Sequence, residues 1–139
     1  MWYFGSSNDS FAPAVKQFFE DKVPGLFISG SFTYTAKLYN GNILAAALYR
    51  NYNASNVEIH LQAEGHFDRA CLRAIFTLPF KVLLCNRLTA IVEAENKRII
   101  RIVNKLGFEK EADLKNFYGL DKDAELYRLD NHKAEKWIT

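Results

Sequence analysis

The chain has 139 residues, of which 49% are hydrophobic, 14% aromatic and 24% charged. This length suits one compact domain covering residues 1–139, because two separate cores would each be too small to be stable. The composition excludes a disordered or fibrous chain. The net charge is only +2, and both halves of the chain balance basic against acidic residues, which argues against nucleic acid or a charged membrane surface as a partner.

The N-terminus lacks the basic head and apolar run of a signal peptide, and no segment reaches the ~20 apolar residues of a membrane span. The two cysteines, Cys71 and Cys85, form no CxxC pair or Cys/His cluster. Free thiols in a reducing compartment are therefore expected. We accordingly expect a cytoplasmic protein that holds no metal and contacts no membrane.

A short strand and then a helix are expected at the start of the chain. Asp9 and Ser10 are residue types that cap helices, and Pro13 is tolerated in a first turn. The apolar residues recur at helical spacing: Phe11, Ala14, Val15, Phe18 and Phe19. The sequence Val23-Pro24-Gly25 should end this helix.

Three antiparallel strands are predicted next, at about 31–39, 43–50 and 57–62, because segments rich in β-favouring residues are separated there by two Asn-rich turns. The third strand alternates apolar with polar residues, which predicts one apolar and one polar face: Val57, Ile59 and Leu61 against Glu58, His60 and Gln62.

A second helix should follow Gly65 and His66, with an apolar stripe made of Phe67, Ala70, Cys71, Ala74, Ile75 and Leu78. Pro79 should kink or end it. Residues 87–94 are a strand candidate. Two further strands, at about 108–117 and 124–129, complete the order strand, helix, three strands, helix, strand, helix, two strands.

The third helix has clear signals at both ends. Asn96 should cap its N-terminus, and Gly107 should adopt the left-handed conformation that ends a helix, with Phe108 making the apolar contact that often follows. Its inward residues should be Ile99, Ile100, Ile102, Val103 and Leu106.

This helix and the order of elements around it resemble the GCN5-related N-acetyltransferase (GNAT) family. The segment 95–108, ENKRIIRIVNKLGF, is similar to that family's signature, in which a capping Asn precedes a Gly-Phe pair by a fixed helix length. The resemblance covers roughly residues 56–130 and is closest to compact bacterial and bacteriophage members of the ribosomal-protein acetyltransferase type. It implies an α+β fold with a central, mostly antiparallel sheet of about six or seven strands flanked by helices.

The resemblance also implies acetyl-CoA as the cofactor and direct transfer of the acetyl group to a primary amine of a small molecule or a protein. In the family, backbone of the third antiparallel strand contacts the pantetheine arm, here around Ile59, His60 and Leu61. Asn96 would bond the same arm in addition to capping its helix. The outer face of this helix is either a solvated surface or, in part, a site for the cofactor's phosphates: Lys97, Arg98, Arg101 and Lys105. The phosphate interpretation names Arg98 and Arg101.

Family members surround the pyrophosphate with a turn of the form Gln/Arg-x-x-Gly-x-Gly/Ala, whose backbone N–H groups face the anion. The corresponding run here is QAEGHF at 62–67, in which Gln62 and Gly65 match. Phe67 replaces the small sixth residue, and Glu64 adds a negative charge. His66 either offsets this charge or is only a polar loop residue. The resemblance places Gln62, Gly65, His66 and Phe67 at the cofactor. The departures favour a second hypothesis, a non-catalytic protein of the same fold, such as a phage structural or accessory component.

Glu58 and His60 are the candidates for the general base that deprotonates the amine. The Glu position is more typical of the family, whereas an imidazole needs a smaller shift to act near neutral pH. The polar alternation is equally compatible with a face that only meets solvent. Tyr118 and Tyr127 are candidates for the acid that reprotonates the thiolate, or are core and sheet residues.

Cys71 lies on an apolar stripe and is expected to be a buried thiol rather than a nucleophile. The acceptor amine is left open by the sequence. Eleven Phe and seven Tyr in so short a chain raise the expectation of a homodimer that buries some of them.

Overall fold

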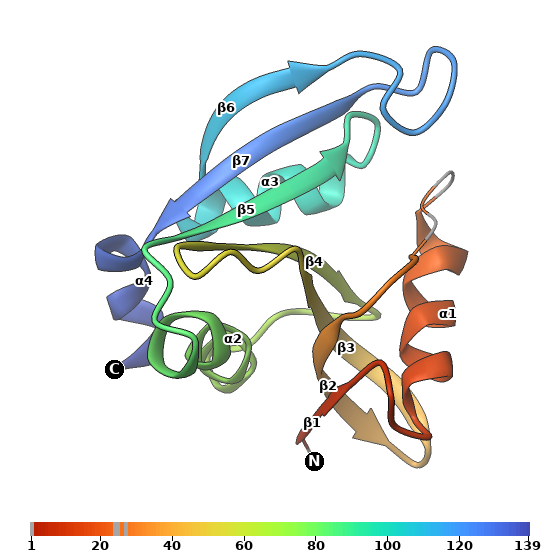
Figure 1. The fold of residues 1–139 in the computed structure, drawn as a ribbon, viewed down its shortest axis with the longest axis vertical. Helices are drawn as coiled ribbons and strands as arrows, with labels where there is room; N and C mark the ends of the chain where they lie inside the picture. Colours follow the sequence, from red (N-terminus) through yellow and green to blue (C-terminus); the bar gives the residue numbers. More distant parts are fainter. Residues whose placement is uncertain (1, 24–25, 27) are drawn as a thin grey trace.

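A computed structural model describes residues 2–23, 26 and 28–139 (Figure 1). Within these residues seven strands form one sheet in the order β1-β2-β3-β4-β5-β7-β6. The strands are β1 (Trp2–Ser6), β2 (Thr33–Tyr39), β3 (Asn42–Arg50), β4 (Asn56–Ala63), β5 (Arg87–Glu93), β6 (Glu109–Leu114) and β7 (Ala124–Asp130). Neighbouring strands are antiparallel except β4 and β5, which are parallel.

The helices are α1 (Ala12–Lys22), α2 (Arg69–Thr77), α3 (Lys97–Leu106) and α4 (Asn131–Ile138), and a short π-helical turn, Leu78–Val82, continues α2. The α+β class and the mostly antiparallel sheet are confirmed, as is the predicted order of elements up to β7. The helix α1 ends at Lys22, followed by Val23 in an extended conformation. The other two residues of the predicted stop, Pro24 and Gly25, lie outside the described residues.

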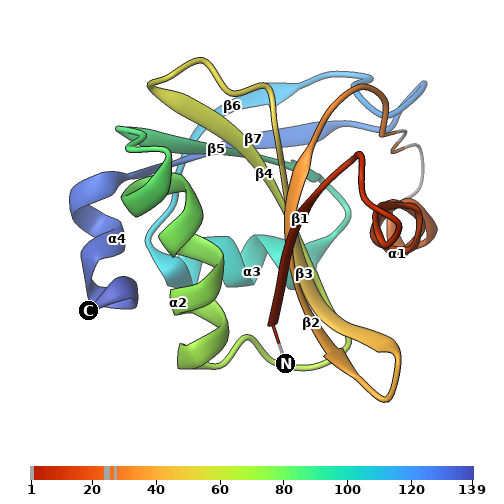
Figure 2. The same ribbon diagram turned by 60° about the horizontal axis from the view of Figure 1, so that its bottom comes forward.

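Helices cover the sheet on both faces (Figures 1 and 2). Residues Ala46 and Leu48 of β3 belong to the core beneath α1. Their neighbours Ala47 and Tyr49 belong to the larger core beneath α2, α3 and α4. This alternation follows from the two-residue period of a strand, and it means that β3 is buried on both faces.

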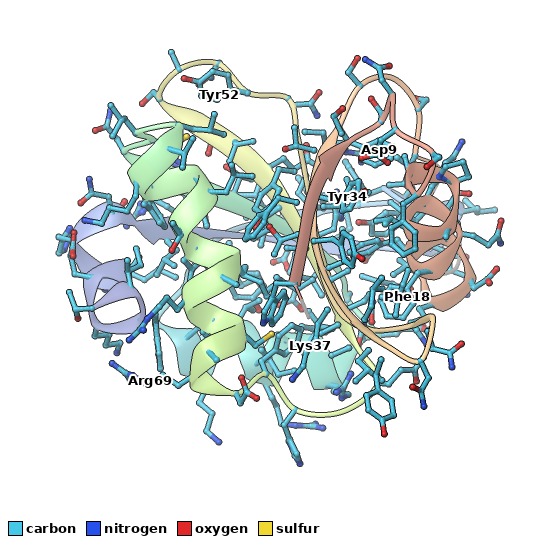
Figure 3. All side chains as sticks on the ribbon, turned by 90° about the horizontal axis from the view of Figure 1, so that it is seen from below. Asp9, Phe18, Tyr34, Lys37, Tyr52 and Arg69 are labelled. Atoms are coloured by element: carbon cyan, nitrogen blue, oxygen red, sulfur yellow. The ribbon has the colours of Figure 1, made fainter. Side chains whose placement is uncertain are left out.

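Asp9 ties the start of α1 to the sheet. Its carboxylate accepts hydrogen bonds from the backbone N–H groups of Ser6, Phe11 and Ala12 and from the Tyr34 hydroxyl at 2.8 Å (Figure 3). The predicted capping role of Asp9 is thus supported, although it acts from three residues before the first helical residue. A single carboxylate fixes where α1 begins relative to β2.

The predicted stripe on α2 was partly wrong. Ala70 is exposed, whereas Leu72 and Phe76 are buried beside Cys71 and Ile75. The sequence did not predict α4, which lies beside α2 over the same core and contacts both α2 and β7, so α2 is covered by the sheet and by α4. The Arg69 guanidinium donates to the carbonyl of Lys136 at 2.5 Å, so the C-terminal helix is bonded to α2 as well as packed on it. In α1, likewise, Ala14 is exposed and Ala12 is buried.

The helix α3 has the predicted ends. The Asn96 side chain accepts a hydrogen bond from the N–H of Ile99 at 3.3 Å. Gly107 has φ +102° and donates to the carbonyls of Asn104 and Val103, and the N–H of buried Phe108 bonds the same Val103 carbonyl at 3.0 Å. These are the bonds that satisfy the last carbonyls of a helix.

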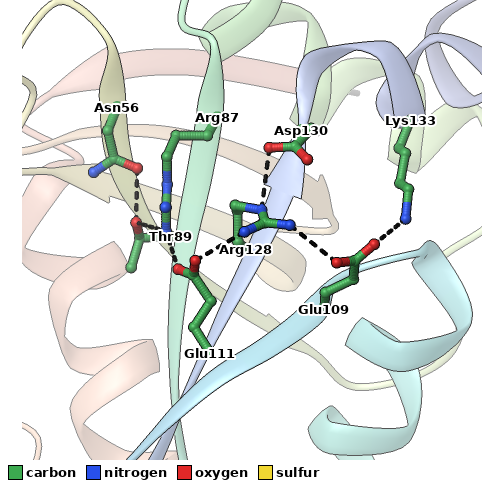
Figure 4. Close-up of polar contacts among 8 residues, drawn as sticks. All are labelled: Asn56, Arg87, Thr89, Glu109, Glu111, Arg128, Asp130 and Lys133. Atoms are coloured by element: carbon green, nitrogen blue, oxygen red, sulfur yellow. Dashed lines mark hydrogen bonds and ion pairs between the residues drawn. The ribbon is translucent and has the colours of Figure 1, made fainter.

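The face of β5, β6 and β7 opposite α3 carries a ladder of charged side chains (Figure 4). Arg128 contacts Glu109 and Glu111, each at 2.9 Å, and Glu111 also contacts Arg87 at 2.6 Å. Each exposed pair contributes little by itself. Together they place charge along β6, an edge strand that would otherwise be open to pairing with another chain. Among the described residues no helix is long and apolar enough to cross a membrane.

The left-handed conformation of Gly107 makes a prediction about stability. A side chain at this φ costs about 1–2 kcal/mol, so Gly107→Ala should lower the free energy of unfolding by about 1 kcal/mol in a urea titration. Lys105→Ala, an exposed change in the last turn of the same helix, is the control and should cost under about 0.5 kcal/mol. Equal effects of the two substitutions would contradict the assignment.

Candidate active site

The parallel strands β4 and β5 part halfway along their length. They pair only where Asn56–Ile59 faces Arg87–Ala90. Beyond this point β4 continues along β3 as far as Ala63, and β5 continues along β7 as far as Glu93 (Figure 1). Backbone groups on the inner edges of these two strand ends thus have no strand partner within the described chain. The carbonyls of Ala63, Ile91 and Glu93 accept hydrogen bonds from Arg98, Tyr118 and Asn96, and the remaining groups are available to bond a ligand.

A narrow cavity of about 20 Å³ lies at this separation. Its polar lining is His60 and Gln62 of β4, Glu93 of β5, Asn96 before α3 and Tyr118 of the β6–β7 loop. Apolar residues of β4, β5, α3 and the end of α1 supply the rest of the wall. It adjoins a wider hollow of about 580 Å³, lined by the ends of α1, β4 and β5 and the start of α3. We call these the central cavity and the outer hollow. Gln62, Glu93 and Asn96 line both of them.

The polar face of β4 is buried. Glu58, His60 and Gln62 are 8%, 7% and 6% exposed, so the interpretation of this face as a solvent surface is wrong. α1, which comes more than thirty residues earlier, covers it: Phe19 and Val23 line the central cavity with His60. Buried polar side chains need partners, and the partners of Glu58 decide its chemistry.

Glu58 is held by three side chains. The Nε2 of His60 lies 3.0 Å from Glu58 Oε1, the Asn51 amide donates to Oε2 at 2.7 Å, and the Arg50 guanidinium donates to Oε1 at 3.4 Å. Burial acts to raise the pKa of Glu58, but the hydrogen bond and charge of His60, with Asn51 and Arg50, lower it to about 2. The carboxylate therefore stays ionised and is a weak base.

His60 gains a defined orientation from this contact. An ionised carboxylate only accepts hydrogen bonds, so the Nε2 of His60 carries a hydrogen and donates it to Glu58. In the neutral ring the lone pair is then on Nδ1. Because His60 lines the central cavity, the arrangement is an imidazole beside the cavity whose orientation is set by a carboxylate.

The two candidate tyrosines lie in different places. Tyr118 lines the central cavity, and its hydroxyl donates to the carbonyl of Ile91 at 3.3 Å. Burial and the negative charges of Glu58 and Glu93 raise the pKa of Tyr118 above its usual range, which keeps the proton on the phenol. Tyr127 is in the core beneath the helices and bonds Glu125, and it does not line the cavity. Burial and this bond raise the pKa of Tyr127 to about 12.

The run expected to hold the pyrophosphate is tied to α3. Arg98 donates to the carbonyls of Ala63, at 2.9 Å, and Gly65. The other residue named for the phosphates, Arg101, is exposed further along the helix. His66 is exposed, whereas Phe67 packs against the core. The Phe67 ring therefore contributes to the packing of the protein interior.

Gly65 lies in open space. A Cβ added there would meet no atom within 4 Å, and its φ is not in the left-handed region. Neither packing nor backbone strain in this chain therefore requires glycine. Close approach of a ligand to the backbone is a reason for it, and this fits a phosphate at the loop.

Two carboxylates near this loop disfavour an anion there, because they carry negative charge. Glu64 forms an ion pair with Lys22 of α1 at 2.7 Å. Asp68 caps α2 by accepting a hydrogen bond from the N–H of Cys71 at 2.8 Å. Asp68 precedes an apolar helical pattern, so sequence rules for helix starts could have found its role. The pair of Lys22 with Glu64 joins distant segments and gave no local signal.

The sequence did not predict a role for several other residues of the site. Arg50 and Asn51, which hold Glu58, end β3 and begin the turn after it, and only the pairing of β3 with β4 brings them to Glu58. Glu93 was part of a strand candidate with no role assigned.

Cys71 is buried as predicted, and burial raises its pKa to about 12. Within the described residues no group of three or more His, Cys, Asp or Glu side chains could hold a metal ion.

The comparisons with known proteins identify the fold. No family model matches the sequence, and no curated protein matches it. Among solved structures the chain is similar to the spermidine N-acetyltransferase SpeG of Vibrio cholerae in complex with CoA and spermine, with a TM-score of 0.75 and 11% identity over 96% of this chain and 98% of that chain. This chain has the GNAT fold.

Two further structures agree. A dodecameric SpeG of Vibrio cholerae in an intermediate state matches the GNAT fold of this chain with a TM-score of 0.73 and 10% identity over 95% of each chain. A probable acetyltransferase matches with a TM-score of 0.64 and 18% identity over 91% of this chain and 72% of that chain. The predicted fold is thus confirmed, and the closer resemblance to ribosomal-protein and bacteriophage enzymes stays a prediction.

The lowered pKa of Glu58 predicts a pH dependence of stability. The ionised form contributes stability at every pH above the ordinary carboxyl value of 4.5, and this contribution is lost as the pH falls toward about 2. Glu58→Gln removes the titration, so its melting temperature should fall less steeply than that of the wild type between about pH 5 and 2. Glu95→Gln, an exposed change, is the control. Parallel curves for wild type and Glu58→Gln would contradict the pairing.

Proposed function

We propose that this protein is an acetyl-CoA-dependent N-acetyltransferase that acts on a primary amine. The observation that carries the proposal is the separation of β4 from β5 at Ile59 and Ala90. It leaves open backbone edges beside the His60–Glu58 pair, and it leads past Asn96 to the outer hollow. The GNAT fold supports the same activity, because SpeG and a probable acetyltransferase are among the solved structures of this fold that match the chain.

The cofactor's residues follow from this arrangement. The inner edge of Ile59–Leu61 would bond the pantetheine arm through backbone groups, in the manner of an added strand. Asn96 lines both hollows and would bond the same arm. Gln62, Gly65, His66 and the backbone of Phe67 would surround the pyrophosphate, while Arg98 holds their loop in place and Arg101 offers a charge further along α3.

Acetyl-CoA supplies an activated acetyl group. The remaining chemistry falls to proton transfers and positioning by this chain, which are sufficient because proximity and orientation account for much of the rate of such transfers. Nδ1 of His60 takes a proton from the amine, and Glu58 holds the ring and stabilises the charge that forms. Tyr118 keeps its proton in the buried cavity and donates it to the departing thiolate. Tyr127 has no place in this scheme.

The carboxylates of Glu64 and Asp68 favour a second candidate function. Both lie close to the loop that should hold an anion, and like charges repel. A protein that has the GNAT fold but no longer binds the cofactor, with a structural or accessory role, would account for them. Binding of acetyl-CoA distinguishes the two functions.

Acetyl-CoA should raise the melting temperature of the wild-type protein, because a ligand that binds only the native state stabilises it. Gly65→Val should leave the melting temperature of the free protein nearly unchanged, since the site has room for a side chain, but should weaken acetyl-CoA binding at least about tenfold by blocking approach to the loop. Lys105→Ala is the control for binding. The absence of any shift at millimolar acetyl-CoA would exclude the enzyme and favour the second candidate.

Substitutions at the cavity should separate chemistry from binding. With spermidine as the probe amine, His60→Gln should lower kcat by about 10²–10⁴ while acetyl-CoA binding is retained. Tyr118→Phe should lower kcat by a smaller factor. Tyr127→Phe is the matched control outside the cavity and should leave kcat within about twofold. Release of the CoA thiol is the measurement, and full activity of His60→Gln would remove this residue from the mechanism.

A further inference from the structure

Glu93 is fixed at the boundary between the central cavity and the outer hollow. It is the last residue of β5 and pairs with Ala124 of β7. Its carbonyl accepts the N–H of Asn96 at 2.9 Å, and the next residue, Ala94, donates to the carbonyl of Asp123 at 2.9 Å. The turn from β5 into α3 is therefore held on both sides, and the Glu93 side chain lines both hollows.

The Glu93 side chain belongs to a largely buried residue and has no partner among the described residues. The residue is 7% exposed, and no residue of the described chain gives its side chain a hydrogen bond or ion pair. Glu58, which is buried to the same degree, has three partners. The Glu93 carboxylate oxygens are not among the fully enclosed polar atoms of the described residues, and the residue lines the outer hollow. This largely buried, unpaired carboxylate is therefore placed to take its partner from a ligand that enters the hollow.

The cations nearest to this carboxylate in the outer hollow are already engaged. Lys22 is paired with Glu64 at 2.7 Å, and the Arg98 guanidinium donates to two backbone carbonyls. Besides Glu64, the other carboxylate that lines this hollow is Glu95, which is exposed at the rim. The missing partner of Glu93 is therefore a cation or hydrogen-bond donor from outside the chain.

We propose that Glu93 binds the ammonium group of the acceptor through a charge-assisted hydrogen bond and so selects a cationic amine. This inference rests on the proposed acetyltransferase function. A carboxylate does not suit the cofactor's phosphates, which are anionic, so it belongs to the acceptor. An amine bound there lies in the cavity that His60 and Tyr118 also line, where the proton can pass to His60 before the nitrogen attacks.

The test is calorimetry with spermidine as the probe, on protein saturated with CoA, which cannot react. Spermidine should bind the wild type, and Glu93→Gln, which keeps the shape and removes the charge, should weaken its binding at least about tenfold. In turnover with acetyl-CoA the same substitution should raise the spermidine KM by a similar factor and change kcat by less than about threefold. Glu95→Gln removes an equal charge from the rim and should change neither by more than twofold.

The outcomes separate this inference from the proposed function. If CoA binds but Glu93→Gln and Glu95→Gln bind spermidine equally, or if the wild type binds no spermidine at millimolar concentration, the role of Glu93 is overturned and the acetyltransferase proposal stands. If CoA itself does not bind, the proposed function fails first, and with it the acceptor role. Unchanged CoA affinity and melting temperature in Glu93→Gln show that a loss of spermidine binding is not a loss of fold.

Discussion

The end of the parallel pairing between β4 and β5 is the constraint on which the site depends. A sheet normally satisfies the backbone of an interior strand on both edges. Here the two central strands keep their outer partners to the end but lose each other after Ile59 and Ala90. A parallel pair needs a long crossover, and α2 with its π-helical turn provides it. The opening in the middle of the sheet is thus a property of its topology and needs no added domain.

Burial on both faces gives this opening its chemistry. The larger core lies beneath α2, α3 and α4, and the smaller one lies beneath α1. Polar side chains on β4 are therefore largely withdrawn from water. Each needs a hydrogen-bond partner, either within the protein or from a ligand. Glu58 is an example of the first case, with His60, Asn51 and Arg50 around it. The contrast between bonded and unbonded carboxylates is more informative than the presence of carboxylates in the cavity.

Local signals in the sequence predicted much of the fold. Asn96 and Gly107 mark the ends of α3 because capping depends on residues within one turn of the helix. The alternation in β4 predicted a strand, but it could not show that the polar face is covered, because the covering helix α1 is distant in sequence. The stripe on α2 was misassigned at Ala70 for the same reason, since α4 at the far end of the chain covers α2 together with the sheet.

The candidate site was less accessible to sequence reasoning than the fold. His60 and Glu58 were identified from a resemblance and an alternating pattern, but their contact and the resulting donor at Nε2 depend on rotamers and on Arg50 from the neighbouring strand. Glu93 carries no pattern at all. It follows three apolar residues at the end of a strand, and only the separation of β5 from β4 turns it toward an empty space rather than a neighbour.

The near-zero net charge of the chain suits the proposed site, which would take an anion and a cation together. A strongly basic surface would attract the cofactor and repel a cationic acceptor, and an acidic one would do the reverse. The chain instead separates the charges over short distances: exposed basic residues follow the outer side of α3, and the unpaired carboxylate of Glu93 is buried between β5 and α3. Because Glu93 is largely withdrawn from solvent, its charge is screened less than the charges of the exposed basic residues. In the proposed enzyme a single, largely buried carboxylate would therefore select the acceptor without opposing the cofactor at the surface.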